Sequence, residues 1–544
     1  MTRNFTALLL AGALLWTAGG CSDCRGSAKE GDAPAAPAGR SDAGLGAESR
    51  FGIDYVFPFV ARYRDEALAR TMASTGAGWV NFAEVRWGAV EPKPPEEGTH
   101  DYRWDELDEA VSIWQRQGFR LVFTLRMGKG WFAGPIKHDP EVMPPLLALM
   151  LSHSDRLPAP EHDRAYDAWI AALVERYDGD GNADMPGLAN PVLHYQVGNE
   201  YANPAFWTGT LSDYGELLER TARAVASACS EAKVISNGIR WNDLFHGDPE
   251  AKRFEERFDA FVEALPSDEW RREWKRARAF TEGTVALAKH FHILDAGGNG
   301  PYPTATAGYL AWVRRELAKT EAKPAIWDLE SRCEPLLVHE PTLTFHRSLA
   351  VPDGATLLKR LKTPLHRDHD RVEAWYRAEQ ARSLVQVFVA RFAAGAEKVF
   401  MGMPDDWDKS PAAWGAPNPF LGLVDRKGQP WPALAALRTL VAELDGFVTA
   451  APVAAPEGVE LFRFTFPPPR TPTWVAWLRV EAPYGLDDPL PRRKVVLDAI
   501  RGPATVRPVP TKAEPALPTT LPSGQPLQLD LAPTPVTITS PSPG

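Results

Sequence analysis

The stretch "VLHYQVGNEY" (Val192–Tyr201) places a short apolar run directly before a glycine, an asparagine and a glutamate. An uninterrupted apolar run of this length is typical of a buried strand in a parallel sheet. In barrels and open α/β sheets, polar side chains that do chemistry sit where such strands end. The stretch therefore predicts a strand over Val192–Val197 that presents Asn199 and Glu200 at its carboxyl end.

Further apolar runs of the same kind recur along the chain, with amphipathic segments between them. The other candidate strands are Phe51–Phe57, Gly78–Glu84, Arg120–Leu125, Lys233–Ser236, Phe291–Ala296, Pro324–Leu329 and Lys398–Met401. Candidate helices, with apolar positions at three- and four-residue steps, include Trp104–Gln117, Ala165–Tyr177, Tyr214–Cys229, Ala378–Gly395 and Trp431–Leu444. Eight strand–helix units predict an α/β fold, a (β/α)8 TIM barrel, over residues 50–446. A doubly wound open sheet is the alternative, but no glycine-rich phosphate turn follows the first strand.

Residues 447–544 have a different sequence pattern from the predicted barrel. Short strand-like runs such as "VELFRFTF" and "TWVAWLRV" alternate with turns rich in proline and glycine. This pattern predicts a small C-terminal antiparallel β-domain resembling a sandwich.

The amino-terminal residues have the features of an export signal. Residues 1–20 contain Arg3 and an apolar stretch too short to span a bilayer. "TAGGC" resembles a bacterial lipobox, which would make Cys21 the lipidated first residue of a lipoprotein at the cell envelope; an ordinary secretory signal is the alternative. Residues 21–49 are rich in Ala, Gly, Asp and Ser and predict a flexible tether.

Composition excludes several classes of function. The chain has 544 residues and a formal net charge of −10, and no basic stripe is visible, so a nucleic-acid partner is not expected. The four cysteines do not form a metal-binding pattern, and no metal or organic cofactor is predicted. Contact with a membrane is expected only through the lipid anchor, and the oligomeric state is left open.

A second glutamate follows another strand. "KPAIWDLE" ends at Glu330, and the ends of barrel strands meet at one face, so Glu200 and Glu330 can converge. Hydrolysis of a glycosidic bond with retention needs two carboxyl groups roughly 5–5.5 Å apart, one to donate a proton and one to attack. Asn199 can orient Glu200 and bind a sugar hydroxyl. The pair therefore predicts a carbohydrate substrate.

Aromatic side chains in loops past strand ends can stack on the apolar faces of sugar rings. Tyr302, Trp241 and Trp407 are the candidates for binding substrate, and Trp131 and Trp207 are in similar positions. Tryptophans are also common in cores, so each of these residues has a structural alternative.

At these residues the sequence resembles the glycoside hydrolases of clan A. "VGNE" matches the family's Asn-Glu signature, "PAIWDLES" is similar to its nucleophile strand, and Asn81–Val111 and Phe420–Leu437 resemble two further conserved blocks of families 42, 39 and 5. The resemblance implies Glu200 as acid/base and Glu330 as nucleophile of a retaining enzyme acting on β-linked glycans or glycosides. A transglycosylase would use the same residues.

Two departures from the family pattern stand out. The family commonly has an arginine where strand two has Asn81, and a histidine or tyrosine where strand six leads to Gly297. Tyr302 and His292 are the candidates to substitute for the latter. Loss of such support can silence a site. The alternative function is therefore a catalytically silent carbohydrate-binding surface lipoprotein.

A polar turn at "YDGDGNADMPGL" raises the question of calcium. Asp178, Asp180, Asn182 and Asp184 alternate like the early ligands of a calcium loop, but Ala183 replaces the required glycine and Ala189 takes the place of the bidentate glutamate. We favour a polar turn after a helix.

Overall fold

The computed structural model describes residues 49–144, 148, 154–239, 241, 243–297, 303–407, 419–480, 482–501, 503–512, 514, 516–522 and 526–540. The predicted signal segment, the lipidation site Cys21 and nearly all of the tether lie outside these residues, as does Tyr302.

Eight parallel strands close into a barrel in chain order, and β8 pairs with β1. The strands are β1 (Phe51–Val56), β2 (Trp79–Arg86), β3 (Arg120–Arg126), β4 (His194–Val197), β5 (Lys233–Ile235), β6 (Ile293–Asp295), β7 (Ala325–Ser331) and β8 (Lys398–Met401). Each overlaps one of the eight predicted strands. The predicted (β/α)8 barrel is confirmed, and the open-sheet alternative is wrong.

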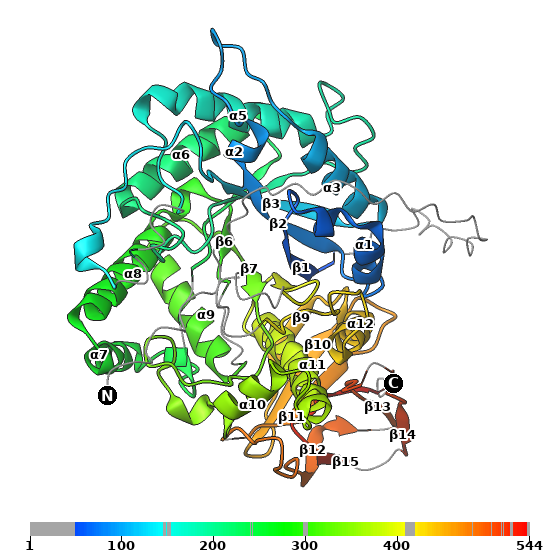
Figure 1. Ribbon diagram of the computed structural model, residues 1–544. Coiled ribbons are helices and arrows are strands. Elements are labelled where there is room, and N and C mark those ends of the chain that lie inside the picture. The colour runs from blue at the N-terminus through cyan, green and yellow to red at the C-terminus, as the bar shows by residue number, and fades with distance from the viewer. Residues whose placement is uncertain are drawn as a thin grey trace.

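Helices surround the barrel (Figure 1). The α-helices are α1 (Glu66–Ala73), α2 (Trp87–Val90), α3 (Asp105–Arg116), α5 (Asp163–Tyr177), α6 (Leu211–Ala228), α7 (Phe254–Ala264), α8 (Asp268–Ala286), α9 (Pro303–Leu317), α10 (Gly354–Leu361), α11 (His369–Ala393) and α12 (Pro432–Leu444). Short 3-10 turns are η1 (Ala61–Arg64), η2 (Pro140–Val142), η4 (Pro160–His162), η5 (Asp243–Phe245), η6 (Ala288–His290) and η7 (Arg347–Leu349). None of the helices in the described residues combines the length and hydropathy needed to cross a membrane.

The pattern of α3 shows why these segments become helices on the barrel. Leu107, Val111 and Trp114 recur at four- and three-residue steps and are all buried, while Asp105 and Glu106 begin the helix. Apolar residues at this spacing form one stripe that packs inward, and acidic residues suit the positive end of the helix dipole.

The barrel interior is built in layers. Trp79, Trp327 and Phe400 belong to an apolar cluster inside the barrel, and Trp79 is the first residue of β2. Two residues further along β2, on the same face, comes Asn81. This step marks a change from an aromatic layer to a polar one, and the polar layer lies at the carboxyl ends of the strands.

The C-terminal domain contains a six-stranded antiparallel sheet, ordered β14-β13-β16-β11-β10-β9, and a two-stranded sheet, β12-β15. Its strands are β9 (Thr449–Pro452), β10 (Val459–Thr465), β11 (Thr473–Leu478), β12 (Arg493–Arg501), β13 (Ala504–Pro508), β14 (Thr519–Leu521), β15 (Pro526–Leu531) and β16 (Val536–Thr539). Side chains from both sheets, such as Trp474 and Leu497, share one core. The predicted antiparallel β-domain is confirmed. It lies beside α11 (Figure 1). There the Gln386 Nε2 donates to the Pro533 carbonyl at 2.8 Å.

Candidate active site

Irregularities in two strands turn side chains into the mouth of the barrel. The register of β1 shifts between Ile53 and Val56, and that of β7 shifts between Asp328 and Ser331. Bulges of this kind re-aim side chains next to functional sites. Tyr55 lies in the first irregularity, with φ of 62°, and Glu330 lies in the second.

Glu330 is held through both of its carboxylate oxygens. It is 6% exposed. The Tyr55 hydroxyl donates to Oε1, and the Asn199 Nδ2 donates to Oε2 at 3.2 Å. Because Asn199 follows β4, this second contact joins the end of β4 to the end of β7.

Glu200 follows Asn199 and is 2% exposed. Its backbone is left-handed, with φ of 50°, and its neighbours are anchored: the Tyr201 N–H donates to Asn237 Oδ1 at 3.0 Å. Burial raises the pKa of Tyr55, and among the further causes are the negative charges of Glu330 and Glu200. Both carboxylates therefore lie near enough to the Tyr55 phenol for their charges to raise its pKa.

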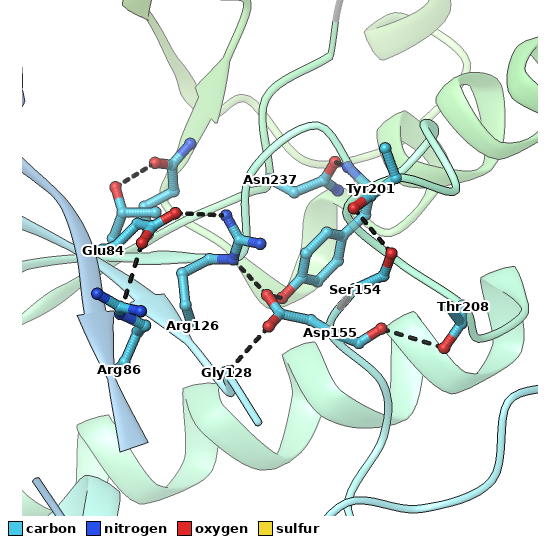
Figure 2. Close-up of polar contacts among 12 residues, drawn as sticks. Glu84, Arg86, Arg126, Gly128, Ser154, Asp155, Tyr201, Thr208 and Asn237 are labelled. Atoms are coloured by element: carbon cyan, nitrogen blue, oxygen red, sulfur yellow. Dashed lines mark hydrogen bonds and ion pairs between the residues drawn. The ribbon is translucent and has the colours of Figure 1, made fainter. Parts of the chain in front are cut away.

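An ion-pair network supports the Glu200 loop from the β2 and β3 side (Figure 2). The Tyr201 hydroxyl donates to Asp155 Oδ2 at 2.8 Å, and the Arg126 guanidinium contacts the same carboxylate. Although burial disfavours the charged guanidinium, Asp155 and Glu84 raise the pKa of Arg126. Glu84 Oε1 lies 3.7 Å from Arg126 Nη1, and Glu84 Oε2 lies 3.5 Å from Arg86 Nε, so this carboxylate forms ion pairs with two arginines.

A chain of buried polar side chains crosses the floor of the site. Asn81 Nδ2 donates to Asp54 Oδ1 at 2.9 Å, the Thr124 hydroxyl lies 3.0 Å from Asn81 Oδ1 and 2.6 Å from Gln196 Oε1, and Gln196 Nε2 donates to Asp295 Oδ2 at 2.6 Å. We call these five residues the polar belt. It links β1, β2, β3, β4 and β6 beneath the two glutamates.

The acids of the belt favour their neutral forms. Burial raises the pKa of Asp295 to about 8, and burial followed by the charge of Glu330 raises the pKa of Asp54. A carboxyl with a pKa of about 8 is mostly protonated at neutral pH. On β7, burial raises the pKa of Asp328 to about 6 against the opposing effect of Arg391, whose Nε lies 2.8 Å away.

The sequence reasoning missed Tyr55 and Arg332. Arg332 follows β7, and its Nη1 lies 3.7 Å from Glu334 Oε1. Burial, the largest influence, lowers the pKa of Arg332, but the nearby charges of Tyr55, Glu334 and Glu330 outweigh it and raise this pKa. On β2, where the resembled family commonly has an arginine, Asn81 belongs to the polar belt and donates to Asp54. At strand six, a Cβ on Gly297 would lie only 3.2 Å from the Glu330 Cβ, so this position is crowded by Glu330 itself.

The predicted substrate-binding aromatics have different settings. Trp407 is partly exposed in the loop after β8, and its backbone N–H donates to the Pro419 carbonyl at 2.9 Å. Trp241 is 6% exposed and is surrounded by Phe254, Phe258 and Trp312. Trp241 is therefore a core residue. Trp407, which is partly exposed, remains the better candidate to stack on a sugar ring.

The acidic turn after α5 brings Asp178, Asp180 and Asp184 together, with carboxylate oxygens within 4.8 Å of one another. The Asp184 carboxylate accepts hydrogen bonds from the Gly179 N–H at 2.9 Å and the Gly181 N–H at 2.7 Å. These contacts explain the acidic residues as stabilisers of the turn.

The closed (β/α)8 barrel has counterparts among solved structures. The chain is similar in structure to a monomeric β-xylosidase from Caulobacter crescentus CB15, with a TM-score of 0.51 and 13% identity over 90% of this chain and 96% of that one. It is also similar to the GH39 enzyme from Xanthomonas axonopodis pv. citri, with a TM-score of 0.50 and 11% identity over 90% of this chain and 93% of that one. No family model and no curated protein matches the sequence. At these identities the likeness establishes the fold.

Proposed function

We propose that the protein is a retaining glycoside hydrolase acting on β-linked glycans or glycosides. The observation that supports this most is the 3.2 Å contact between Asn199 Nδ2 and Glu330 Oε2, because Asn199 directly precedes Glu200 in the chain. Two carboxyl groups and an amide at one barrel mouth are the groups that double displacement requires.

In the first step, Glu330 attacks the anomeric carbon while Glu200 gives its proton to the departing oxygen. The bond to the leaving group breaks, and a glycosyl ester forms on Glu330. In the second step, Glu200, now an anion, takes a proton from water, and the water oxygen replaces Glu330 on the sugar. Asn199 is placed to bind the hydroxyl beside the reacting carbon, where a hydrogen bond strengthens in the transition state.

The surroundings of the two glutamates suit these roles. Glu330 accepts hydrogen bonds from Tyr55 and Asn199, which fix the direction of its carboxyl group. Glu200 is shielded from water, a setting that favours a proton donor.

A catalytically silent carbohydrate-binding barrel is the competing proposal. It is motivated by Asn81 and Gly297, which replace groups that normally support the nucleophile. Tyr55 and Arg332 offer a tyrosine and an arginine beside Glu330 from other elements, and this favours the enzyme.

The proposal is tested with a panel of 2,4-dinitrophenyl and 4-nitrophenyl β-glycosides, beginning with the xylosides. We expect Glu200→Gln to retain the first step on dinitrophenyl substrates, which need little acid assistance, and to form a β-glycosyl azide when azide replaces the missing base. Hydrolysis at the wild-type rate in Glu200→Gln would reject its role. Product analysis separates hydrolysis from transglycosylation.

We also propose that the protein is exported and lipid-anchored through Cys21. The support is the apolar stretch and "TAGGC" at the amino terminus. Metabolic labelling with a radioactive fatty acid should label the wild type and not Cys21→Ser; equal labelling would reject the anchor.

A further inference from the structure

We propose that Asp155, in the loop between β3 and α5, is a positioning residue that sets the direction of Glu200 through Tyr201. The inference rests on the proposed function, and it assigns the support of the acid/base to a loop that does not carry Glu200 itself. The Asp155 carboxylate contacts Tyr201, the residue that follows Glu200 in the chain, so Asp155 acts at one remove from the reaction.

The backbone at Glu200 depends on support from its surroundings. Its φ of 50° lies in the left-handed region, which a residue with a side chain keeps only when the surrounding structure imposes it. Gly198, two residues earlier, also has a positive φ, of 76°. Two left-handed residues within three positions turn the chain sharply, so the direction of the Glu200 side chain depends on the contacts that hold this turn.

The Tyr201 ring lies at the centre of the turn. It packs against Gly198, where an added Cβ would come 2.2 Å from the ring carbon Cζ, and it stacks on Trp207 with ring centroids 4.6 Å apart. The backbone N–H of Tyr201 donates to Asn237 Oδ1 at 3.0 Å. The turn that carries Glu200 is therefore folded around this one ring, and a shift of the ring would shift the turn.

Asp155 holds the hydroxyl end of that ring (Figure 2). It is 1% exposed; its Oδ2 accepts from the Tyr201 hydroxyl at 2.8 Å and also contacts the Arg126 guanidinium, and its Oδ1 accepts from the Gly128 N–H at 3.0 Å. Burial, and then the charge of Asp155, raises the pKa of Tyr201, so the phenol keeps the proton that it donates. Because Arg126 ends β3, the carboxylate joins Tyr201 to the wall of the barrel.

The backbone around Asp155 is fastened to the loop after β4 independently of the carboxylate. The Asp155 N–H donates to the Phe206 carbonyl at 2.9 Å, and the Asp155 carbonyl accepts from the Thr208 N–H at 2.9 Å. The Ser154 hydroxyl donates to the Pro204 carbonyl at 2.8 Å. These main-chain contacts survive a change of the Asp155 side chain, so such a change tests the carboxylate and not the attachment of the whole loop.

A positioning role and a purely structural role differ in how the rate depends on the leaving group. A misdirected Glu200 donates its proton poorly to the departing oxygen, while attack by Glu330 is less affected. A leaving group that departs readily as an anion needs little proton donation, whereas an alcohol or a sugar needs it. A purely structural defect would lower the rates on both kinds of substrate alike.

The test compares a 2,4-dinitrophenyl β-glycoside with an alkyl β-glycoside of the same sugar, using kcat/KM because it reports the first step. Tyr201→Phe removes the hydroxyl and keeps the ring. It should lower kcat/KM on the alkyl glycoside about tenfold, a part of the roughly 10²–10⁴-fold that proton transfer supplies, and on the dinitrophenyl glycoside less than about twofold. Asp155→Asn should show the same pattern, and adding Tyr201→Phe to it should cause no further loss, since both changes break one contact.

Tyr195→Phe is the matched control. It removes a buried hydroxyl from β4 itself, where Tyr195 donates to the Val192 carbonyl at 2.7 Å, ahead of the strand. The ratio of the two rates should stay at the wild-type value in this variant. Equal losses on both substrates in folded Tyr201→Phe would overturn the proposal, as would the same leaving-group dependence in Tyr195→Phe.

Crystal structures of the variants distinguish this inference from the proposed function. The Glu200 carboxylate should be displaced, or divided between two positions, in Tyr201→Phe and in Asp155→Asn, and unmoved in Tyr195→Phe. If the wild type cleaves no glycoside, the proposed function fails, while the structures still decide whether Asp155 directs Glu200. Superimposable Glu200 side chains in all of these proteins would overturn the inference.

Discussion

The two ends of the barrel interior differ in chemistry although the same strands build both. At the amino end, Trp79, Trp327 and Phe400 pack in an apolar cluster. Towards the carboxyl end, one step of two residues along β2 leads from Trp79 to Asn81 and the polar belt. The first layer stabilises the barrel by burying hydrocarbon, and the second buries polar side chains that hydrogen-bond to one another.

The largest expected effect falls at the polar end. Glu330→Gln should lower kcat on an activated aryl glycoside by at least about ten-thousand-fold, because the attacking oxygen is lost. Its thermal unfolding should show no loss of stability, since the change removes a charge near Asp54, Asp295 and Asp328. Substantial turnover by this variant would remove Glu330 from the mechanism.

A substitution at the apolar end should act on stability instead. Trp79→Ala deletes a fully buried ring that packs edge-on against Trp327 and should lower the free energy of unfolding by about 3–5 kcal/mol. Urea titration measures this. The variant molecules that remain folded should keep the wild-type KM; a large change in KM would show that the two layers are not independent.

Asp295→Asn tests the protonation of the belt. The pKa of Asp295 rises from its ordinary 3.8 to about 8, so between these values the folded chain holds a proton that the unfolded chain has lost. The contribution of this group to the free energy of unfolding is therefore fully present below about pH 4, and it is lost as the pH rises towards 8. Urea titrations at pH 5 and pH 8 should show a smaller decline in Asp295→Asn. An identical pH dependence in both proteins would contradict a neutral Asp295.

The smallest effect is expected at the rim. Glu84→Gln weakens contacts of 3.5 and 3.7 Å with Arg86 and Arg126, and partly exposed pairs of this kind contribute at most about 1 kcal/mol. The midpoint of urea unfolding should change little. A loss of several kcal/mol would place Glu84 within the structural core of the site.

The strands and both glutamates were predictable because each depends on local sequence. Apolar runs specify buried parallel strands, and polar residues directly after them mark the functional face. Asn199, Glu200 and Glu330 therefore followed from their positions at strand ends.

Tyr55 and Arg332 were not predictable in the same way. Tyr55 stands inside an apolar strand, and only the register shift in β1 turns it towards Glu330. Nothing in the local sequence distinguishes Arg332, directly after β7, from the other arginines of the chain. Trp241 shows the opposite case: its loop position indicated a sugar contact, but aromatic residues of α7 and α9 surround it.

The central claim is tested most directly by covalent trapping of the nucleophile. The protein is incubated with 2,4-dinitrophenyl 2-deoxy-2-fluoro-β-glycosides, weighed and digested. The account predicts a gain of one fluorosugar per chain, on the peptide that contains Glu330, and no gain in Glu330→Gln. Binding of the sugar without a covalent adduct, or an adduct on another residue, would contradict it.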